Sequence, residues 1–109
     1  MLLLTTSAPN IGNSIYRAPE MDQANSKINE KVDIFSLGII FFEMLCHFKT
    51  GMERIKCIEA LKEKKEFPKT WTGNEASEDF VLELISIAPG ARPSTFEILN
   101  RHPWDVTER

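Results

Sequence analysis

The chain has little of several residue types, and each scarcity excludes a class of protein. Its 2 cysteines and 2 histidines lack metal-ligand spacing, so neither a disulfide scaffold nor a metal site is predicted. Its charges nearly balance, with 13 basic against 16 acidic residues, which gives no general attraction to nucleic acid or to an anionic membrane. A single globular domain of 109 residues is therefore expected, with no nucleic-acid or membrane partner.

Long hydrophobic runs are also missing. Met1–Leu4 is apolar, but the run ends at Thr5 and has no basic flank, so it is too short for the core of a signal peptide. The most apolar stretch, Val32–Phe48, is broken by charged and polar residues and falls short of a membrane span. Cys46 and Cys57 lie in apolar helical surroundings, as expected for buried free thiols in a reducing compartment. These features predict a cytoplasmic protein.

The first part of the chain and the part that follows it differ in pattern. Residues 1–30 have no hydrophobic period and contain prolines, a glycine and asparagines, which predicts an irregular arm with one helical turn near Pro19. Residues 31–48 are apolar on nearly every face, which predicts a helix that is buried almost all round. A strand over Ile39–Phe42 is the alternative, although the length of the run favours a helix. The helix keeps one narrow polar stripe, formed by Asp33, Ser36 and Glu43.

A second, amphipathic helix is predicted over residues 50–66. Thr50 and Glu53 have the spacing of a capping box, in which the first side chain caps the helix and the second reaches back. Phe67-Pro68 ends the pattern, and Lys62–Lys65 is expected to be a solvated helix end. The apolar line that should face the core consists of Met52, Ile55, Ile58 and Leu61.

Two further helices complete the pattern. Residues 75–88 carry an apolar stripe that Pro89-Gly90 closes, and residues 93–102 open with a second capping box from Ser94 to Glu97. The predicted fold class is all-α, with four helices and an irregular N-terminal arm.

Three motifs, in this order, resemble the C-lobe of eukaryotic protein kinases. Gly12–Glu20 resembles the end of the activation segment, G-T-x-x-Y-x-A-P-E, and Asp33–Gly38 is similar to the start of kinase helix F. Arg92-Pro93-Ser94, followed by His102-Pro103-Trp104, resembles the motif and the helix that close the domain. The resemblance implies an activation-segment end and loop over 1–30, helix F over 31–48, helix G over 50–66, helix H over 75–88 and helix I over 93–102.

A narrower resemblance concerns the kinases that phosphorylate the α subunit of translation initiation factor 2. It rests on Lys31–Met44, on the Thr-x-Met-Glu-Arg stretch that begins at Thr50, and on Phe67-Pro68. In that family helix G docks the globular substrate. The resemblance therefore implies a stress-response kinase of translation, with initiation factor 2 α as its partner and with Thr50, Met52 and Glu53 as docking residues. The alternative role for Thr50 and Glu53 is the capping box alone.

The resemblance also assigns structural roles to other residues. Glu20 and Arg92 correspond to a buried ion pair that joins the activation segment to the loop before helix I. Asp33 corresponds to the carboxylate that anchors the catalytic loop, with a helix cap as the alternative. Asn13 stands where the family has a threonine, and Ala8 stands where it has its activating threonine, so both positions depart from the pattern. The activation-segment end comprises Gly12, Asn13, Tyr16, Ala18 and Pro19.

The chain lacks the glycine-rich loop, the H-R-D-x-x-x-x-N motif and the D-F-G motif that phosphoryl transfer requires. We therefore expect no catalytic residue and no cofactor in this chain, with ATP and magnesium only in the complete parent kinase. The expected function is the substrate-docking lower lobe of a serine/threonine kinase that is not competent alone. The alternative is a non-catalytic pseudokinase remnant that binds proteins. The apolar helix should also leave an unusually large exposed patch, so the isolated chain should be marginally stable or aggregate.

Overall fold

The structure, a computed structural model, describes residues 14–23 and 28–101 of the chain. These residues contain no strand, and the all-α prediction is confirmed. The predicted helical turn near Pro19 is also present, as a short 3-10 helix. In chain order the elements are η1 (Pro19–Asp22), α3 (Lys31–Met44), α4 (Gly51–Lys64), α5 (Glu75–Leu84), η2 (Pro89–Ala91) and α6 (Thr95–Arg101).

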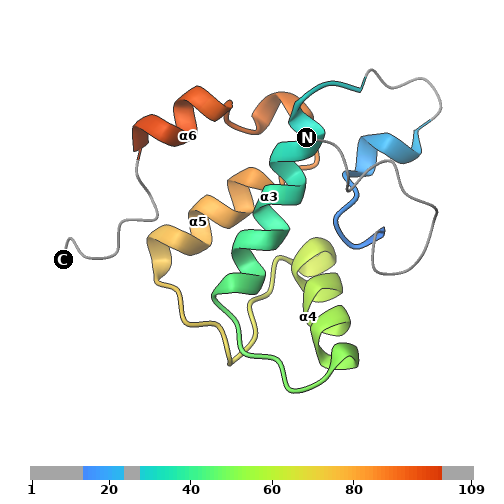
Figure 1. The fold of residues 1–109 in the computed structure, drawn as a ribbon, viewed down its shortest axis with the longest axis vertical. Coiled ribbons are helices and arrows are strands. Elements are labelled where there is room, and N and C mark those ends of the chain that lie inside the picture. The colour runs from blue at the N-terminus through green and yellow to red at the C-terminus, as the bar shows by residue number, and fades with distance from the viewer. Residues whose placement is uncertain (1–13, 24–27, 102–109) are drawn as a thin grey trace.

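Helix α3 runs through the middle of the molecule, as Figure 1 shows. Helices α5 and α6 lie to its left in that view, whereas α4 and the turn η1 lie to its right. The central position of α3 agrees with its sequence, because a helix that is apolar on most faces must be covered on several sides. Burial almost all round is only partly confirmed, because Leu37 and Met44 are exposed on one side of the helix. The buried residues fill the remaining broad sector: Val32, Ile34, Phe35, Ser36, Gly38, Ile39 and Phe42.

Two groups of buried side chains join the elements. The larger group brings the arm, α3, α4 and α5 together, and the smaller one joins α3, α5 and α6. Each fully buried aliphatic or aromatic side chain contributes about 1.5–3 kcal/mol relative to an exposed one. The larger group consists of Ile15, Ala18, Val32, Phe35, Ile39, Phe42, Cys46, Ile58, Leu61, Val81 and Ile85, and the smaller of Ile34, Phe80, Leu84 and Ile98.

Helices α3 and α5 approach each other most closely at Gly38. A Cβ atom at this position would lie 2.7 Å from Ile85 Cγ2 and 2.8 Å from Leu84 Cβ. The second of these atoms is fixed to the α5 backbone, so only a glycine allows this spacing without a shift of the helix.

The capping predictions are partly right. Thr50 Oγ1 accepts a hydrogen bond from Glu53 N at 3.0 Å, as expected, but the Glu53 carboxylate accepts from Lys49 N at 2.7 Å instead of from Thr50 N. The Thr50–Glu53 box is thus wrong in its second half, because the side chain of Glu53 reaches one residue further back. The box between Ser94 and Glu97 is complete, with bonds of 3.1 and 2.8 Å.

A third capping box went unpredicted, at the start of α5. Asn74 Oδ1 accepts from Ser77 N at 2.9 Å, and Ser77 Oγ accepts from Asn74 N at 2.8 Å. The pair lacks the glutamate or glutamine that marks the usual sequence pattern of a capping box.

The helices end earlier than the sequence predicts. Helix α3 stops at Met44 rather than at residue 48, since the carbonyl of Leu45 accepts bonds from both Thr72 N and Thr72 Oγ1, each at 2.8 Å. Helix α4 stops at Lys64 rather than 66, with Lys65 in the left-handed region at φ 59°.

The last two helices are also shorter than predicted. Helix α5 stops at Leu84 rather than at residue 88, because the carbonyl of Ser86 turns toward Arg92 Nε, 2.8 Å away. Helix α6 begins at Thr95, after its cap Ser94, rather than at residue 93, and the predicted end at residue 102 lies outside the described residues.

Several large apolar side chains are exposed. Among them is Met52, which is 63% exposed, so its predicted place in the core-facing line of α4 is wrong. Within the described segments, no helix combines the length and apolar character that crossing a bilayer requires. The other exposed large apolar residues are Ile28, Leu37, Met44, Ile87, Phe96 and Leu99.

Candidate functional site

Glu20 and Arg92 lie together in the interior, although 72 positions separate them in the chain. Arg92 Nη1 and Nη2 each donate to one oxygen of the Glu20 carboxylate at 2.8 Å, which makes the pair bidentate. The same guanidinium donates to the carbonyls of Ser86, Lys31 and Ile87 at 2.8, 2.9 and 3.3 Å. Arg92 is therefore satisfied as a buried cation, and it ties η1 to α3 and to the segment after α5.

The pair remains charged although it is buried. Burial on its own raises the pKa of Glu20, but the hydrogen bonds and the charge of Arg92 outweigh it, so the pKa is lowered. The Arg92 guanidinium also lies 5.0 Å from the centre of the Phe35 ring, which adds a cation–π contact.

A second polar cluster joins the arm, α3 and α4. Tyr16 Oη donates to Glu43 Oε1 at 2.7 Å, and Arg54 Nη2 donates to Tyr16 Oη at 2.6 Å. Arg54 Nε also forms a short ion pair with Glu43 Oε2. Each of the three side chains therefore contacts the other two, and all three are half-buried.

This second cluster differs from the first in its electrostatics. Burial and the bond to Glu43 raise the pKa of Tyr16, while Arg54 acts in the opposite direction. Burial alone lowers the pKa of Arg54, but the bonds to Glu43 and Tyr16 outweigh it, and the pKa is raised. At neutral pH the phenol of Tyr16 is therefore neutral and the guanidinium of Arg54 is charged.

Lys62, at the other end of α4, also contacts the arm. Its Nζ donates to the carbonyl of Ile15 at 3.1 Å and lies 5.7 Å from the centre of the Phe35 ring. Burial lowers the pKa of Lys62, although Asp22, Glu59 and others oppose the shift. The prediction that Lys62 belongs to a solvated helix end is therefore wrong, because it lies on the inner face of α4.

Asp33 occupies the first turn of α3, where a carboxylate is favoured by the helix dipole. It is not the cap, because the N-cap residue is Glu30 and that side chain makes no capping bond. Asp33 Oδ1 is buried and has no hydrogen-bond partner among the described residues. A buried carboxylate oxygen normally has a donor, so Asp33 Oδ1 is an exception among the described residues.

The three predicted docking residues lie at the start of α4. Thr50 and Met52 are exposed and Glu53 is half-buried. The side chains of Thr50 and Glu53 are engaged in the cap, as the alternative role requires, which leaves Met52 as an uncommitted apolar side chain at this end of the helix.

The predicted activation-segment residues fall only partly within the described residues. Gly12 and Asn13 lie outside them. Tyr16 is in the cluster above, and Ala18 is fully buried in the larger core group. Pro19 is half-buried and opens η1, where its missing N–H costs nothing.

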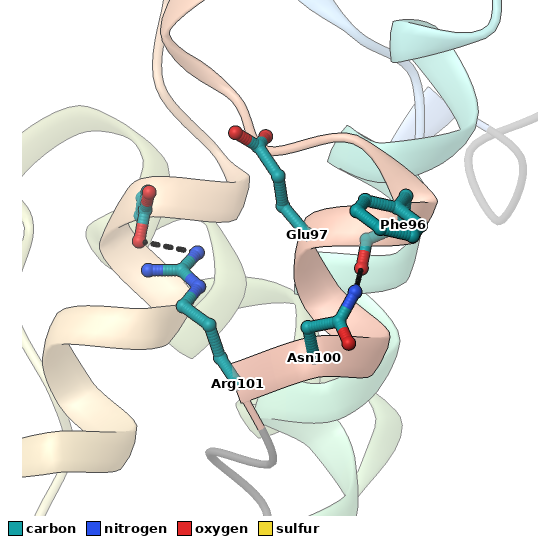
Figure 2. A pocket seen from close by; sticks show the side chains of 5 residues that line it. Phe96, Glu97, Asn100 and Arg101 are labelled. Atoms are coloured by element: carbon teal, nitrogen blue, oxygen red, sulfur yellow. Dashed lines mark hydrogen bonds and ion pairs between the residues drawn. The ribbon is translucent and has the colours of Figure 1, made fainter.

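A pocket of about 390 Å³ lies away from these residues, along α5 and α6. Figure 2 shows Arg101 reaching to Glu83, with 3.0 Å between Nη2 and Oε1, and Asn100 donating to the Phe96 carbonyl at 2.8 Å. None of the residues that line it belongs to the predicted site, so we do not place the function there. The described residues also hold no group of three or more side chains that could bind a metal ion.

Both cysteines are free thiols in the structure. Burial, with smaller effects from the nearby Cys57 and Glu43, raises the pKa of Cys46 to about 12. Burial also raises the pKa of Cys57. Cys46 is therefore a thiol at neutral pH and is unsuited to nucleophilic chemistry.

Comparison with known families agrees with this geometry. Residues 5–104 match the family described as the protein kinase domain. The chain belongs to the protein kinase family. As a kinase chain it is partial, because it spans less than a tenth of the length of the relatives given below.

Similar kinases are found in plants, fungi and animals. The eIF-2-alpha kinase GCN2 of Arabidopsis thaliana is 44% identical over 90 residues, which cover 81% of this chain and 7% of that kinase. GCN2 of Schizosaccharomyces pombe is 38% identical over 82% of this chain and 6% of its own length. Eukaryotic translation initiation factor 2-alpha kinase 3 of Rattus norvegicus is 35% identical over 94% of this chain and 9% of its own length.

Sequence reasoning missed Arg54 and Lys62 as parts of the site. Glu43 was assigned only to the polar stripe of α3, and Arg54 was part of the Thr-x-Met-Glu-Arg stretch with no role of its own. The missing signal is a helical spacing of eight, which places Arg54 and Lys62 on one face of α4 with the buried Ile58 between them.

Proposed function

We propose that the chain is the substrate-docking lower lobe of a serine/threonine kinase that phosphorylates the α subunit of translation initiation factor 2. In this proposal α3, α4, α5 and α6 correspond to kinase helices F, G, H and I, and the arm is the end of the activation segment. The chain alone does not transfer phosphate. The single observation that carries the proposal is the set of relatives, which are kinases of this factor by name.

The start of α4 supports a docking role. Met52 is 63% exposed, while Thr50 and Glu53 stabilise the helix end that presents it. An exposed methionine is an adaptable anchor for an apolar pocket on a partner. The α subunit of initiation factor 2 is the partner that we propose.

The orphan oxygen of Asp33 supports a parent that is larger than this chain. A carboxylate of α3 that lacks donors among the described residues is suited to the backbone N–H groups of a further loop. In the resembling kinases this loop is the catalytic loop. The paired residues Glu20 and Arg92 would then fix the arm below that loop.

ATP and magnesium belong to the proposed parent and not to this chain. The proposal places the parent in the cytosol, where translation initiation occurs.

One test is a binding measurement. Isothermal titration calorimetry of the chain with the purified α subunit of initiation factor 2 should give saturable binding. Met52→Ala should weaken it about tenfold, as is typical of an interface anchor. Met44→Ala is the matched control, since Met44 is 73% exposed but lies on α3, and it should leave the affinity unchanged. Equal losses from the two variants would argue against docking through α4.

A pseudokinase remnant is the second candidate, and Asn13 favours it because asparagine stands in place of the family's threonine. Sequencing of the transcript that encodes the chain separates the two candidates. An open frame upstream of Met1 that carries H-R-D-x-x-x-x-N and D-F-G supports the kinase. A frame without these motifs supports the remnant. A radiolabelled-phosphate assay on the chain alone should be blank in both cases.

A further inference from the structure

Helix α4 has an inner face that reaches the arm at two places. Arg54 contacts the phenol of Tyr16, and Lys62 contacts the carbonyl of the preceding residue, Ile15. The two basic residues are eight positions apart, about 12 Å along a helix, so they hold the arm near both ends of α4. We call Tyr16, Glu43, Arg54 and Lys62 the arm clamp.

Helix α3 supplies the fixed point of the arm clamp. Glu43 accepts from Tyr16 and pairs with Arg54, so one of its carboxylate oxygens contacts the arm and the other contacts α4. In addition, Ser36 Oγ of α3 donates to the carbonyl of Tyr16 at 2.7 Å, and Ser36 is only 2% exposed. The arm is therefore positioned by both neighbouring helices, and a rotation of α4 would pull on Tyr16.

The opposite face of α4 carries exposed side chains. Lys56 is exposed there, as is Met52 at the start of the helix. The helix thus separates an outer surface that is available to a partner from an inner surface that holds the arm. A rigid helix transmits a small displacement on one side to the other side.

We propose that Arg54 is a positioning residue that couples partner docking on the outer face of α4 to the conformation of the arm. This inference rests on the proposed docking function. Arg54 touches no reacting group, and it acts through Glu43 and Tyr16. A partner that binds to α4 orders residues 14–23, and a disturbed arm in turn weakens the binding of the partner.

The planar guanidinium of Arg54 is essential to this role. It donates from Nε to Glu43 and from Nη2 to Tyr16, in two directions at once. A lysine at this position keeps the charge but carries its N–H donors on one compact nitrogen, so it cannot reproduce the fork that places Nε on Glu43 and Nη2 on Tyr16. The conservative variant Arg54→Lys therefore separates coupling from simple charge neutralisation.

Amide hydrogen exchange read by mass spectrometry tests the proposal on the whole chain. In the wild type, addition of the α subunit of initiation factor 2 should slow exchange of the peptide that covers residues 14–23. In Arg54→Leu, free exchange of this peptide should be about tenfold faster, the effect of losing charge-assisted hydrogen bonds, and the partner should no longer slow it. Arg54→Lys should keep near-normal free exchange but lose most of the partner effect.

The control is Lys56→Ala, an exposed lysine on the same helix, which should behave as the wild type in free exchange. Peptides from α3 and α5 report whether a variant is folded, and they should exchange normally in Arg54→Lys. Unchanged free exchange at residues 14–23 in both Arg54 variants would overturn the clamp. A partner effect that persists at full size in both variants would overturn the coupling.

A failure of the docking proposal can be distinguished from a failure of the arm clamp. If the α subunit does not bind the wild type, the proposed docking function fails and the coupling falls with it. The partner-free comparison of Arg54→Leu with Lys56→Ala still decides whether the clamp holds the arm.

Discussion

Two fastenings that contain an ion pair join the arm to the helices, and the two differ in their surroundings. The Glu20–Arg92 pair is closed to water, with side-chain exposures of 6% and 0%. The Glu43–Arg54 pair is half-buried, with side-chain exposures of 17% and 33%, and Glu43 also accepts a hydrogen bond from the phenol of Tyr16. The comparison indicates that the first fastening holds the fold together, whereas the second can adjust.

The energetics support this division. Removal of one partner from a dry ion pair leaves the other partner as an unpaired buried charge, which is costly. In a half-exposed cluster, water replaces the lost partner and the cost is small. The two fastenings therefore differ in what happens when they are broken more than in how strong they are when intact.

The largest effect is expected from Arg92→Leu. The variant leaves the Glu20 carboxylate buried without its partner, so the free energy of unfolding should fall by about 3–5 kcal/mol, enough to unfold a marginal chain. Urea denaturation followed by circular dichroism measures the change. The double variant Glu20→Leu with Arg92→Leu should be less destabilised than Arg92→Leu alone. A loss below about 1 kcal/mol, the range of surface pairs, would remove the distinction between the two fastenings.

Acid should weaken the first fastening, because Glu20 must be ionised to pair with Arg92. The pKa of Glu20 is lowered in the folded chain, so its contribution is fully present above the ordinary glutamate pKa of about 4.3 and is lost as pH falls through the lowered value. The stability gap between the wild type and Glu20→Gln should therefore narrow below about pH 4, as measured by urea titrations at a series of pH values. A gap that stays constant down to pH 3 would contradict the lowered pKa.

Tyr16→Phe should have a modest effect, because it removes one hydroxyl and leaves the Glu43–Arg54 pair in place. The expected loss is about 0.5–1 kcal/mol of unfolding free energy, measured by thermal or urea denaturation. A loss as large as that of Arg92→Leu would show that the second fastening is as rigid as the first.

The smallest effect is expected from Arg17→Ala, which serves as a control within the arm. Arg17 pairs with Asp22 at 2.9 Å, but their side chains are 39% and 69% exposed. Loss of such a pair costs at most about 0.5 kcal/mol, and salt screens it further. A clear loss of unfolding free energy that salt does not reduce would indicate that the whole arm is strained.

The sequence predicted the helices well because their signals are local. The apolar run of α3 and the caps at Thr50 and Ser94 are all read within a few neighbouring residues. Helix ends were missed where a distant group takes a carbonyl, as Thr72 does at Leu45 and Arg92 does at Ser86. No local pattern contains this information.

The site was predicted unevenly for the same reason. The meeting of Glu20 and Arg92 was expected only from the resemblance to kinases, since 72 positions separate the two residues. The arm clamp was not expected, because Tyr16, Glu43 and Arg54 lie in three separate parts of the chain and none of the motifs that contain them indicates that they meet. Met52 was placed in the core by its helical period, but it lies in the first turn of α4 and is 63% exposed.

Gly38 shows how much can depend on a missing side chain. Its contact fixes the height at which α5 lies against α3, and α5 leads directly into the segment that carries Arg92. A single methyl group at this point would clash with Leu84 and Ile85, so α5 would have to shift although no charged residue had changed. Selection for an undisturbed arm would therefore exclude any larger side chain at Gly38, although Gly38 belongs to neither fastening.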